Sequence, residues 1–224
     1  MRLTCTEYGI DLKMQENKVN VLVIEAPDIF AGIVDILMDQ IEGKSGNIII
    51  SNKDIIMKLD KVAEIIINPF VIDCNEKRIQ QKLYQELTNE IQESMMEHTA
   101  QLQGSIISYL EELLQKSPYF LEFDVEDNMT GLLKLCHVGI ADQVETLAGK
   151  IANYMKALKQ FCAINILFLV NIKLFVTQEE IEEIYQCAFY EKINLVLLEN
   201  TAREKLANET ICILDKDMCI INVD

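Results

Sequence analysis

The chain has 224 residues, of which 50% are hydrophobic and 25% charged, a composition typical of a globular protein with one core and room for a smaller appendage. Its formal net charge of −16 argues against a broad nucleic-acid-binding surface, but a local strip among its 20 basic residues remains compatible with that charge. No apolar run reaches the ~18 residues of a membrane span, and the N-terminus lacks a signal-peptide apolar region, so we expect a cytoplasmic protein.

The N-terminal third predicts alternating strand and helix. The apolar run at 20–24 predicts a buried strand, Pro27 predicts the start of a helix, and apolar residues at helical spacing continue that helix to about Ile41. Two further strands are predicted near 47–51 and 62–67, where β-branched residues are frequent.

Between the first helix and the next strand, Gly43-Lys44-Ser45 matches the end of the phosphate-binding motif G-x-x-x-x-G-K-[ST]. The full motif needs a glycine where this chain has Met38, and its loop must leave a strand and enter a helix. Here the order is reversed. We therefore interpret residues 43–46 as a helix-to-strand turn rather than a phosphate loop.

The middle third predicts a long helix. From Asn75 to about Lys116 there is no proline and one glycine, and apolar residues recur at helical spacing. A continuous helix of this length would extend for roughly 60 Å and project from a compact domain. Its narrow apolar seam predicts packing against one other helix, in the same chain or in a partner subunit, and His98 is expected as a half-buried packing residue in this seam.

The C-terminal third predicts a strand–helix–strand unit. After an initial asparagine in each, the runs 165–170 and 194–198 are continuously apolar, as strands covered on both faces are, and Thr177 with Glu180 forms a capping box between them. Short strands at 211–214 and 218–223 follow. The predicted fold class is therefore α/β, with a mostly parallel sheet in a head domain (1–74 and 142–224) and an extended, all-helical leg domain (75–141).

Motifs for catalysis are scarce. The chain has two histidines and neither G-x-S-x-G nor H-E-x-x-H, while its seven cysteines form no C-x-x-C pair, so neither a zinc site nor a disulfide framework is indicated. One acidic loop offers alternate carboxylates, the ligands that calcium prefers, although the EF-hand pattern is not met. The residues alone favour a solvated acidic loop over a calcium site at Glu122, Asp124, Glu126 and Asp127.

Four stretches together resemble a known family: VLVIEAPDIF at 21–30, NEKRIQQKLY at 75–84, INLVLLE at 193–199 and ILDKDM at 213–218. In order and spacing they are similar to the short form of the ring-forming spacer-acquisition protein of type II-A CRISPR systems, the Csn accessory family. The chain departs from that pattern at Ala26, where a capping asparagine is frequent, and at Asn200, where a proline is usual. Residues 115–145 align poorly.

The resemblance implies a P-loop-like head that has lost its nucleotide site, a helical leg, a homotetrameric ring, bound calcium, and no enzymatic activity. It also implies binding of double-stranded DNA ends through the central hole, in CRISPR spacer acquisition, with the CRISPR integrase and effector nuclease as partners. The acidic loop 122–127 falls near the family's calcium carboxylates, which makes its four acidic residues candidate ligands. An acidic protein can hold DNA if its positive charge lines the channel.

Candidate phosphate contacts lie on two segments, and for each of them a solubilising surface lysine is the alternative interpretation. They are Lys53, Lys58, Lys61, Lys150, Lys156 and Lys159. Two rival functions remain open: a divergent nucleotide-dependent phosphotransferase, and a structural scaffold that assembles through the leg seam alone.

Overall fold

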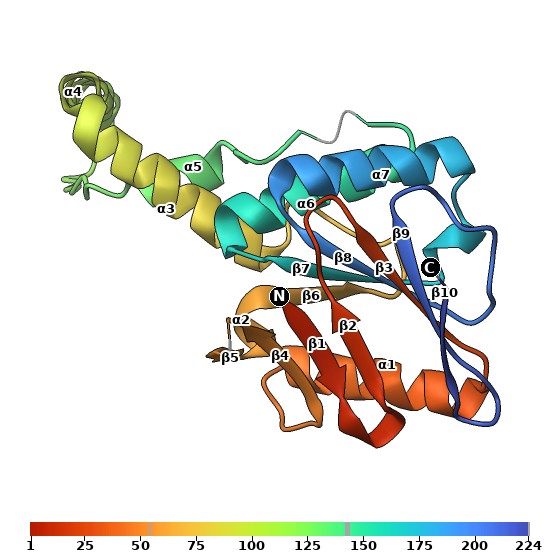
Figure 1. Cartoon of the computed structure of the whole chain (residues 1–224). Coiled ribbons are helices and arrows are strands. Elements are labelled where there is room, and N and C mark those ends of the chain that lie inside the picture. The colour runs from red at the N-terminus through yellow and green to blue at the C-terminus, as the bar shows by residue number, and fades with distance from the viewer. Residues whose placement is uncertain (54, 142–143, 224) are drawn as a thin grey trace. The chain divides into compact units, whose positions relative to one another are not determined.

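The structure is a computed structural model that describes residues 1–53, 55–141 and 144–223 (Figure 1). The chain divides into an α/β unit, Met1–Cys74 with Asp142–Asp224, and a helical unit, Asn75–Ala141. No helix in the described part of the chain is long and apolar enough to cross a membrane.

A six-stranded, mostly parallel sheet forms the centre of the α/β unit, as the sequence predicts. Its order is β10-β9-β3-β8-β7-β6, and every neighbouring pair is parallel except β9 with β10. Its strands are β3 (Val19–Ile24), β6 (Ala63–Ile66), β7 (Ile166–Val170), β8 (Asn194–Glu199), β9 (Glu209–Leu214) and β10 (Ile220–Val223).

Helices cover both faces of this sheet, which explains why its central strands are mostly apolar. Figure 1 shows α6 (Leu147–Cys162) and α7 (Gln178–Glu191) on one face and α1 (Pro27–Ile41) on the other. The predicted capping box begins α7, and the connection β7–α7–β8 joins two neighbouring parallel strands. The predicted strand–helix–strand unit is thus confirmed.

A second, antiparallel sheet was not expected from the sequence. Its order is β2-β1-β4-β5, and it shares a core with α1 and the six-stranded sheet. The strands are β1 (Arg2–Cys5), β2 (Ile10–Lys13), β4 (Ile48–Asn52) and β5 (Ile55–Met57), and three short helices accompany the two sheets, η1 (Thr6–Tyr8), α2 (Leu59–Val62) and η2 (Ile172–Leu174). Only β4 was predicted, because the others have three or four residues and give a weak alternating pattern.

The helical unit contains α3 (Lys77–Ser94), α4 (Met96–Leu114) and α5 (Met129–Leu135). The prediction of one continuous helix was wrong, because the helix breaks at Met95, whose φ of −122° and ψ of 15° lie outside the helical range. The Ser94 hydroxyl donates to the Glu90 carbonyl at 3.0 Å, the kind of side-chain bond that competes with helix continuation.

Packing inside the helical unit is uneven. On α3, Ile79 and Tyr84 are buried, and the Tyr84 hydroxyl donates to the Val138 carbonyl at 2.9 Å. On α4, in contrast, no residue is buried. The expectation of a half-buried His98 was also wrong, since His98 is exposed. The part of the apolar seam on α3 is therefore packed within this chain, while much of α4 is exposed.

Candidate functional site

The Gly43–Gly46 segment is the predicted turn, lying between the end of α1 at Ile41 and the start of β4 at Ile48. Lys44 pairs with Asp39 at 2.6 Å and with Glu42 at 2.9 Å, and these hydrogen bonds raise its pKa. The turn follows the C-terminus of α1, the partially negative end of a helix, which repels phosphate. Its lysine is already paired with two carboxylates and the helix dipole has the wrong sign, so the geometry of this turn does not favour a bound phosphate.

We expect that ATP does not bind measurably to this protein and that Lys44→Ala leaves this result unchanged, because the Lys44 ammonium is already committed to two carboxylates. Isothermal titration calorimetry with ATP and magnesium tests this. Micromolar binding that disappears in Lys44→Ala would contradict the turn interpretation and favour the phosphotransferase alternative.

The first group of candidate lysines lies on one short stretch of chain along β5 and α2. Lys53 follows β4 with a positive φ of 48°, Lys58 is the N-cap of α2, and Lys61 lies in the last turn of that helix. All three side chains are exposed, and Lys61 forms a 3.0 Å ion pair with Asp60. Lys58 also lines a cavity of about 310 Å³ together with Lys44 and Asp60. The three lysines therefore lie close together along the chain, and β5, the edge strand of the four-stranded sheet, separates Lys53 from Lys58.

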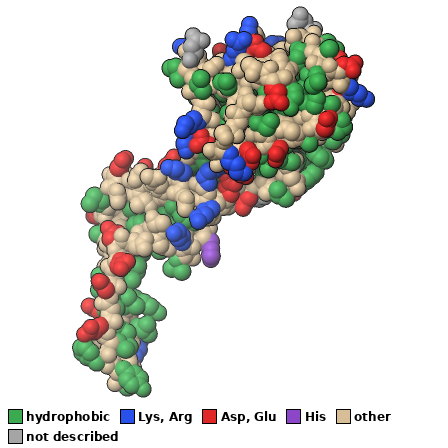
Figure 2. All heavy atoms as spheres, turned by 90° about the horizontal axis from the view of Figure 1, so that it is seen from below, with side chains coloured by type: hydrophobic (Ala, Val, Ile, Leu, Met, Phe, Trp, Pro, Cys, Tyr) green, Lys and Arg blue, Asp and Glu red, His purple; other side chains and the backbone are tan. Residues whose placement is uncertain are grey.

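The second group, on α6, does not share one face. At about 100° per residue, Lys150 and Lys159 point in opposite directions, and each is half-buried at a border of the packed face. The Lys159 ammonium donates to the Asn165 side-chain oxygen at 2.6 Å. Lys156 alone is exposed. On the face drawn in Figure 2, lysine and arginine side chains are interspersed with acidic ones.

The four candidate calcium ligands lie on the segment between α4 and α5, and all are exposed. Asp127 accepts a hydrogen bond from Gln103 at 3.2 Å and lines a cavity of about 430 Å³ between α3 and α4. Among the residues described, no three acidic, histidine or cysteine side chains lie close enough to hold a metal. The carboxylates are suitable calcium ligands, but completing a site would require ligands from a second copy or a rearrangement of this segment.

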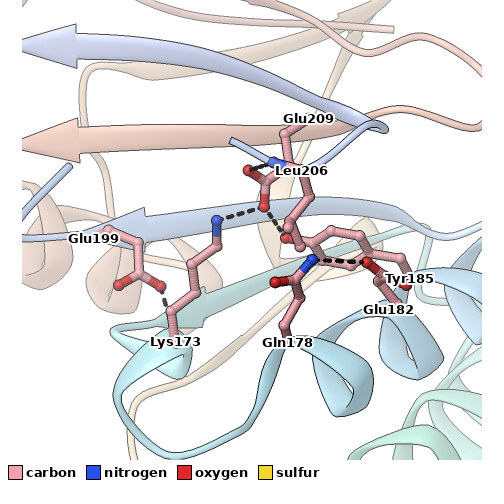
Figure 3. A network of polar contacts seen from close by, with 7 residues as sticks. All are labelled: Lys173, Gln178, Glu182, Tyr185, Glu199, Leu206 and Glu209. Carbon is pink, nitrogen blue, oxygen red and sulfur yellow. Dashed lines mark hydrogen bonds and ion pairs between the residues drawn. The ribbon is translucent and has the colours of Figure 1, made fainter. Parts of the chain in front are cut away.

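A buried network of charges, which sequence reasoning missed, lies beneath α7 (Figure 3). The Glu209 Oε1 atom accepts from the Lys173 ammonium at 2.5 Å and from the Tyr185 hydroxyl at 2.5 Å, and Oε2 accepts from the Leu206 amide at 3.0 Å. Glu199 accepts from the Lys173 backbone amide at 3.2 Å. A carboxylate at the end of an apolar run, as in 194–199, was the available signal.

Burial sets the electrostatics of this network. Glu199 and Glu209 are 1% and 2% exposed, and the Lys173 side chain is 9% exposed. Desolvation raises the pKa of Glu199 to about 6, against the lowering effect of Lys173 and Arg203. Desolvation and the neighbouring Glu209 charge also raise the pKa of Tyr185, which keeps its hydroxyl protonated as a donor. The network fixes α7 and the connection after β7 against the sheet.

The helical unit exposes many large hydrophobic side chains. At about 100° per residue, Leu102, Tyr109 and Leu113 share one flank of α4, where they are 41%, 67% and 48% exposed. Figure 2 shows acidic side chains along one border of this unit and hydrophobic ones along another. We call Leu102, Tyr109 and Leu113 the α4 apolar flank. So large an exposed apolar surface is typical of an interaction site.

Two solved structures are similar to this chain at low sequence identity. One, a dimeric ATP-binding cassette in a post-hydrolysis state bound to ADP and Pi, has 10% identity and a TM-score of 0.41 over 92% of this chain and 84% of its own. The other, the ADP conformation of an ATP-binding cassette of an ABC transporter, has 11% identity and a TM-score of 0.46 over 95% and 85%. Scores this low carry no functional argument.

No curated protein matches the sequence. The sequence model of the CRISPR-associated protein family Cas_Csn2 matches residues 40–218, which span both the α/β unit and the helical unit. The chain therefore belongs to the Cas_Csn2 family of CRISPR-associated proteins.

Proposed function

We propose that this CRISPR-associated protein is a non-enzymatic ring that binds the ends of double-stranded DNA during spacer acquisition. The observation that carries the proposal is the family match over residues 40–218. In this role the protein acts in antiviral defence as a homotetramer, with the CRISPR integrase and effector nuclease as its partners.

The charge distribution supports a ring. A chain with a net charge of −16 repels duplex DNA over most of its surface, so an attractive surface has to be local and sheltered. Lys53, Lys58 and Lys61 provide such a local group at the edge of the four-stranded sheet, and Lys156 adds an exposed charge on α6. In a closed ring these lysines would line the inner surface, while the acidic side chains would face outward.

Self-association is supported by the α4 apolar flank, which a second copy can cover. Calcium is the proposed cofactor of the assembled ring, held by the loop with Glu122, Asp124, Glu126 and Asp127. Ligands shared between copies would explain why a single chain does not bring three of these groups together. Ions that bind the assembly but not its separate chains stabilise it by mass action.

The two rival functions have less support. A nucleotide-dependent phosphotransferase needs a phosphate cradle, and the Gly43–Gly46 turn follows a helix C-terminus with its lysine already paired. A pure scaffold needs the α4 apolar flank but gives no role to the exposed lysine group.

The test compares linear duplex DNA with covalently closed circles of the same sequence, in calcium. We expect linear DNA to bind and circles not to bind, because duplex can reach the inner surface only by threading an end. Contacts to phosphates carry no sequence information, so affinity should not depend on sequence. A gel-shift assay measures both. Equal binding of circles and linear fragments would contradict threading, and binding of neither would favour the scaffold.

Salt dependence identifies the contacts. Each neutralised phosphate contributes about −0.9 to the slope of log affinity against log salt concentration. Lys58→Ala should therefore flatten the slope by about one unit per subunit contact, equally for all sequences. Lys116→Ala is the matched control, because Lys116 lies just after α4 and forms an exposed 3.1 Å ion pair with Glu112. An unchanged slope in Lys58→Ala would remove this residue from the interface.

A further inference from the structure

The network beneath α7 is unbalanced in charge. It buries two carboxylates, Glu199 and Glu209, with the single ammonium of Lys173 (Figure 3). Glu209 has donors on both oxygens, and Lys173 and Tyr185 both point at its Oε1 atom. Glu199 receives one backbone donor on Oε1, and its buried Oε2 atom has no hydrogen-bond partner among the described residues. The imbalance therefore falls on Glu199.

The groups around Glu199 come from four places. Lys173 lies on the connection after β7, Tyr185 on α7, Glu209 at the start of β9, and Arg203 on the segment after β8. Arg203 is exposed, Glu209 repels a negative charge, and the Lys173 ammonium is committed to Glu209. The charge of an ionised Glu199 is thus poorly compensated in this structure, which we call the closed form. A neutral Glu199 has no charge to compensate.

The backbone bond to Glu199 holds a connection that carries exposed apolar side chains. The Glu199 carboxylate accepts from the Lys173 amide within η2. This amide lies next to Leu174 and Phe175, which are 53% and 43% exposed. The Phe175 ring meets Phe70 edge-on with centroids 5.2 Å apart. The same connection is tied to the end of β8 by a 2.8 Å bond from the Asn171 amide to the Leu198 carbonyl. Loosening Glu199 would therefore alter how this apolar pair is presented.

We propose that Glu199 is a proton switch, which closes the connection after β7 onto the sheet when it is neutral and loosens that connection when it is ionised. The sign follows from linkage. The pKa of Glu199 is raised from 4.5 to about 6 in the closed structure, so closure takes up a proton, is fully favoured below pH 4.5, and weakens as pH rises through 6. Between pH 5 and pH 8 the opening constant should rise about eight-fold.

Hydrogen exchange of the amides of residues 172–175, corrected for intrinsic rates, tests the proposal in the full chain. In the wild type, protection should fall about eight-fold from pH 5 to pH 8, and in Glu199→Gln, a neutral isostere, it should stay constant. The matched control is Glu182→Gln, the same substitution at an exposed position on α7, which should retain the wild-type dependence. A pH dependence that survives in Glu199→Gln, or a flat wild-type profile, overturns the proposal.

A direct measurement avoids reliance on the variant. In protein labelled with ¹³C at glutamate carboxyls, the Glu199 resonance should titrate near pH 6 and be absent from Glu199→Gln. A Glu199 carboxyl that titrates at or below its ordinary pKa of 4.5 would overturn the switch even if the loop exchange depends on pH.

Discussion

Lys173→Met is expected to lower the free energy of unfolding of the α/β unit by about 3–5 kcal/mol, because it leaves the Glu209 carboxylate buried without its ammonium. Methionine retains most of the aliphatic stem, so the change removes the charge more than the packing. Urea denaturation at neutral pH, followed by circular dichroism, measures the effect.

Two further variants separate the charge effect from general damage. Lys173→Met combined with Glu209→Gln should recover most of the lost stability, because the glutamine oxygen can still accept from the Leu206 amide while its NH2 group donates to the Tyr185 hydroxyl oxygen. Lys156→Met removes an exposed lysine by the same substitution and should change stability by less than about 0.5 kcal/mol. If Lys173→Met lowers the free energy of unfolding no more than Lys156→Met does, the buried ion pair contributes nothing to stability.

Long apolar patterns predicted the centre of the fold. The runs at 20–24, 165–170 and 194–198 became β3, β7 and β8, because strands covered on both faces are apolar at nearly every position. Pro27 marked the start of α1, and Thr177 with Glu180 marked the start of α7, because both signals act locally on the first helical turn.

Features that depend on distant partners could not be predicted. β1 and β2 have four residues each, and their alternate burial makes sense only against a core supplied by α1 and the larger sheet. The break at Met95 has no proline or glycine beside it, so the composition of 75–116 favoured a continuous helix.

The candidate sites were predictable to different degrees. The reversed strand and helix order around Lys44 was sufficient to dismiss a phosphate loop, because that argument needs only local order. The lysines of α6 were grouped by sequence proximity, yet Lys150 and Lys159 point in opposite directions. The contact between Lys173 and Glu209 joins residues 36 positions apart, and no pattern along the chain indicates it.

Leu102→Lys combined with Tyr109→Lys is expected to dissociate the proposed homotetramer into smaller species. These two side chains are exposed in the single chain, so the helix should keep its fold, while a lysine buried at an interface costs about 3–5 kcal/mol and weakens association by about a hundred-fold or more. Native mass spectrometry and sedimentation in millimolar calcium measure the assembly, and circular dichroism checks the helices.

The matched control places the same two charges about 100° around α4, as Gln101→Lys with Ser108→Lys, both at exposed positions. This variant should remain tetrameric. A tetramer that persists in Leu102→Lys with Tyr109→Lys would exclude the α4 apolar flank as an interface, and a wild type that is monomeric in calcium would contradict the ring itself.

Chelation of calcium should loosen the wild-type assembly. An Asp124→Asn, Glu126→Gln variant with unchanged assembly and ion content would remove the calcium assignment alone.

The dissociated variant also separates the ring from its lysines. It retains Lys53, Lys58 and Lys61, so it should still bind duplex weakly at low salt through phosphate contacts. It has no closed channel, so its binding should no longer distinguish linear DNA from circles. If instead the dissociated protein still prefers linear DNA, the preference comes from a feature of the single chain that recognises an end, and threading is not its cause.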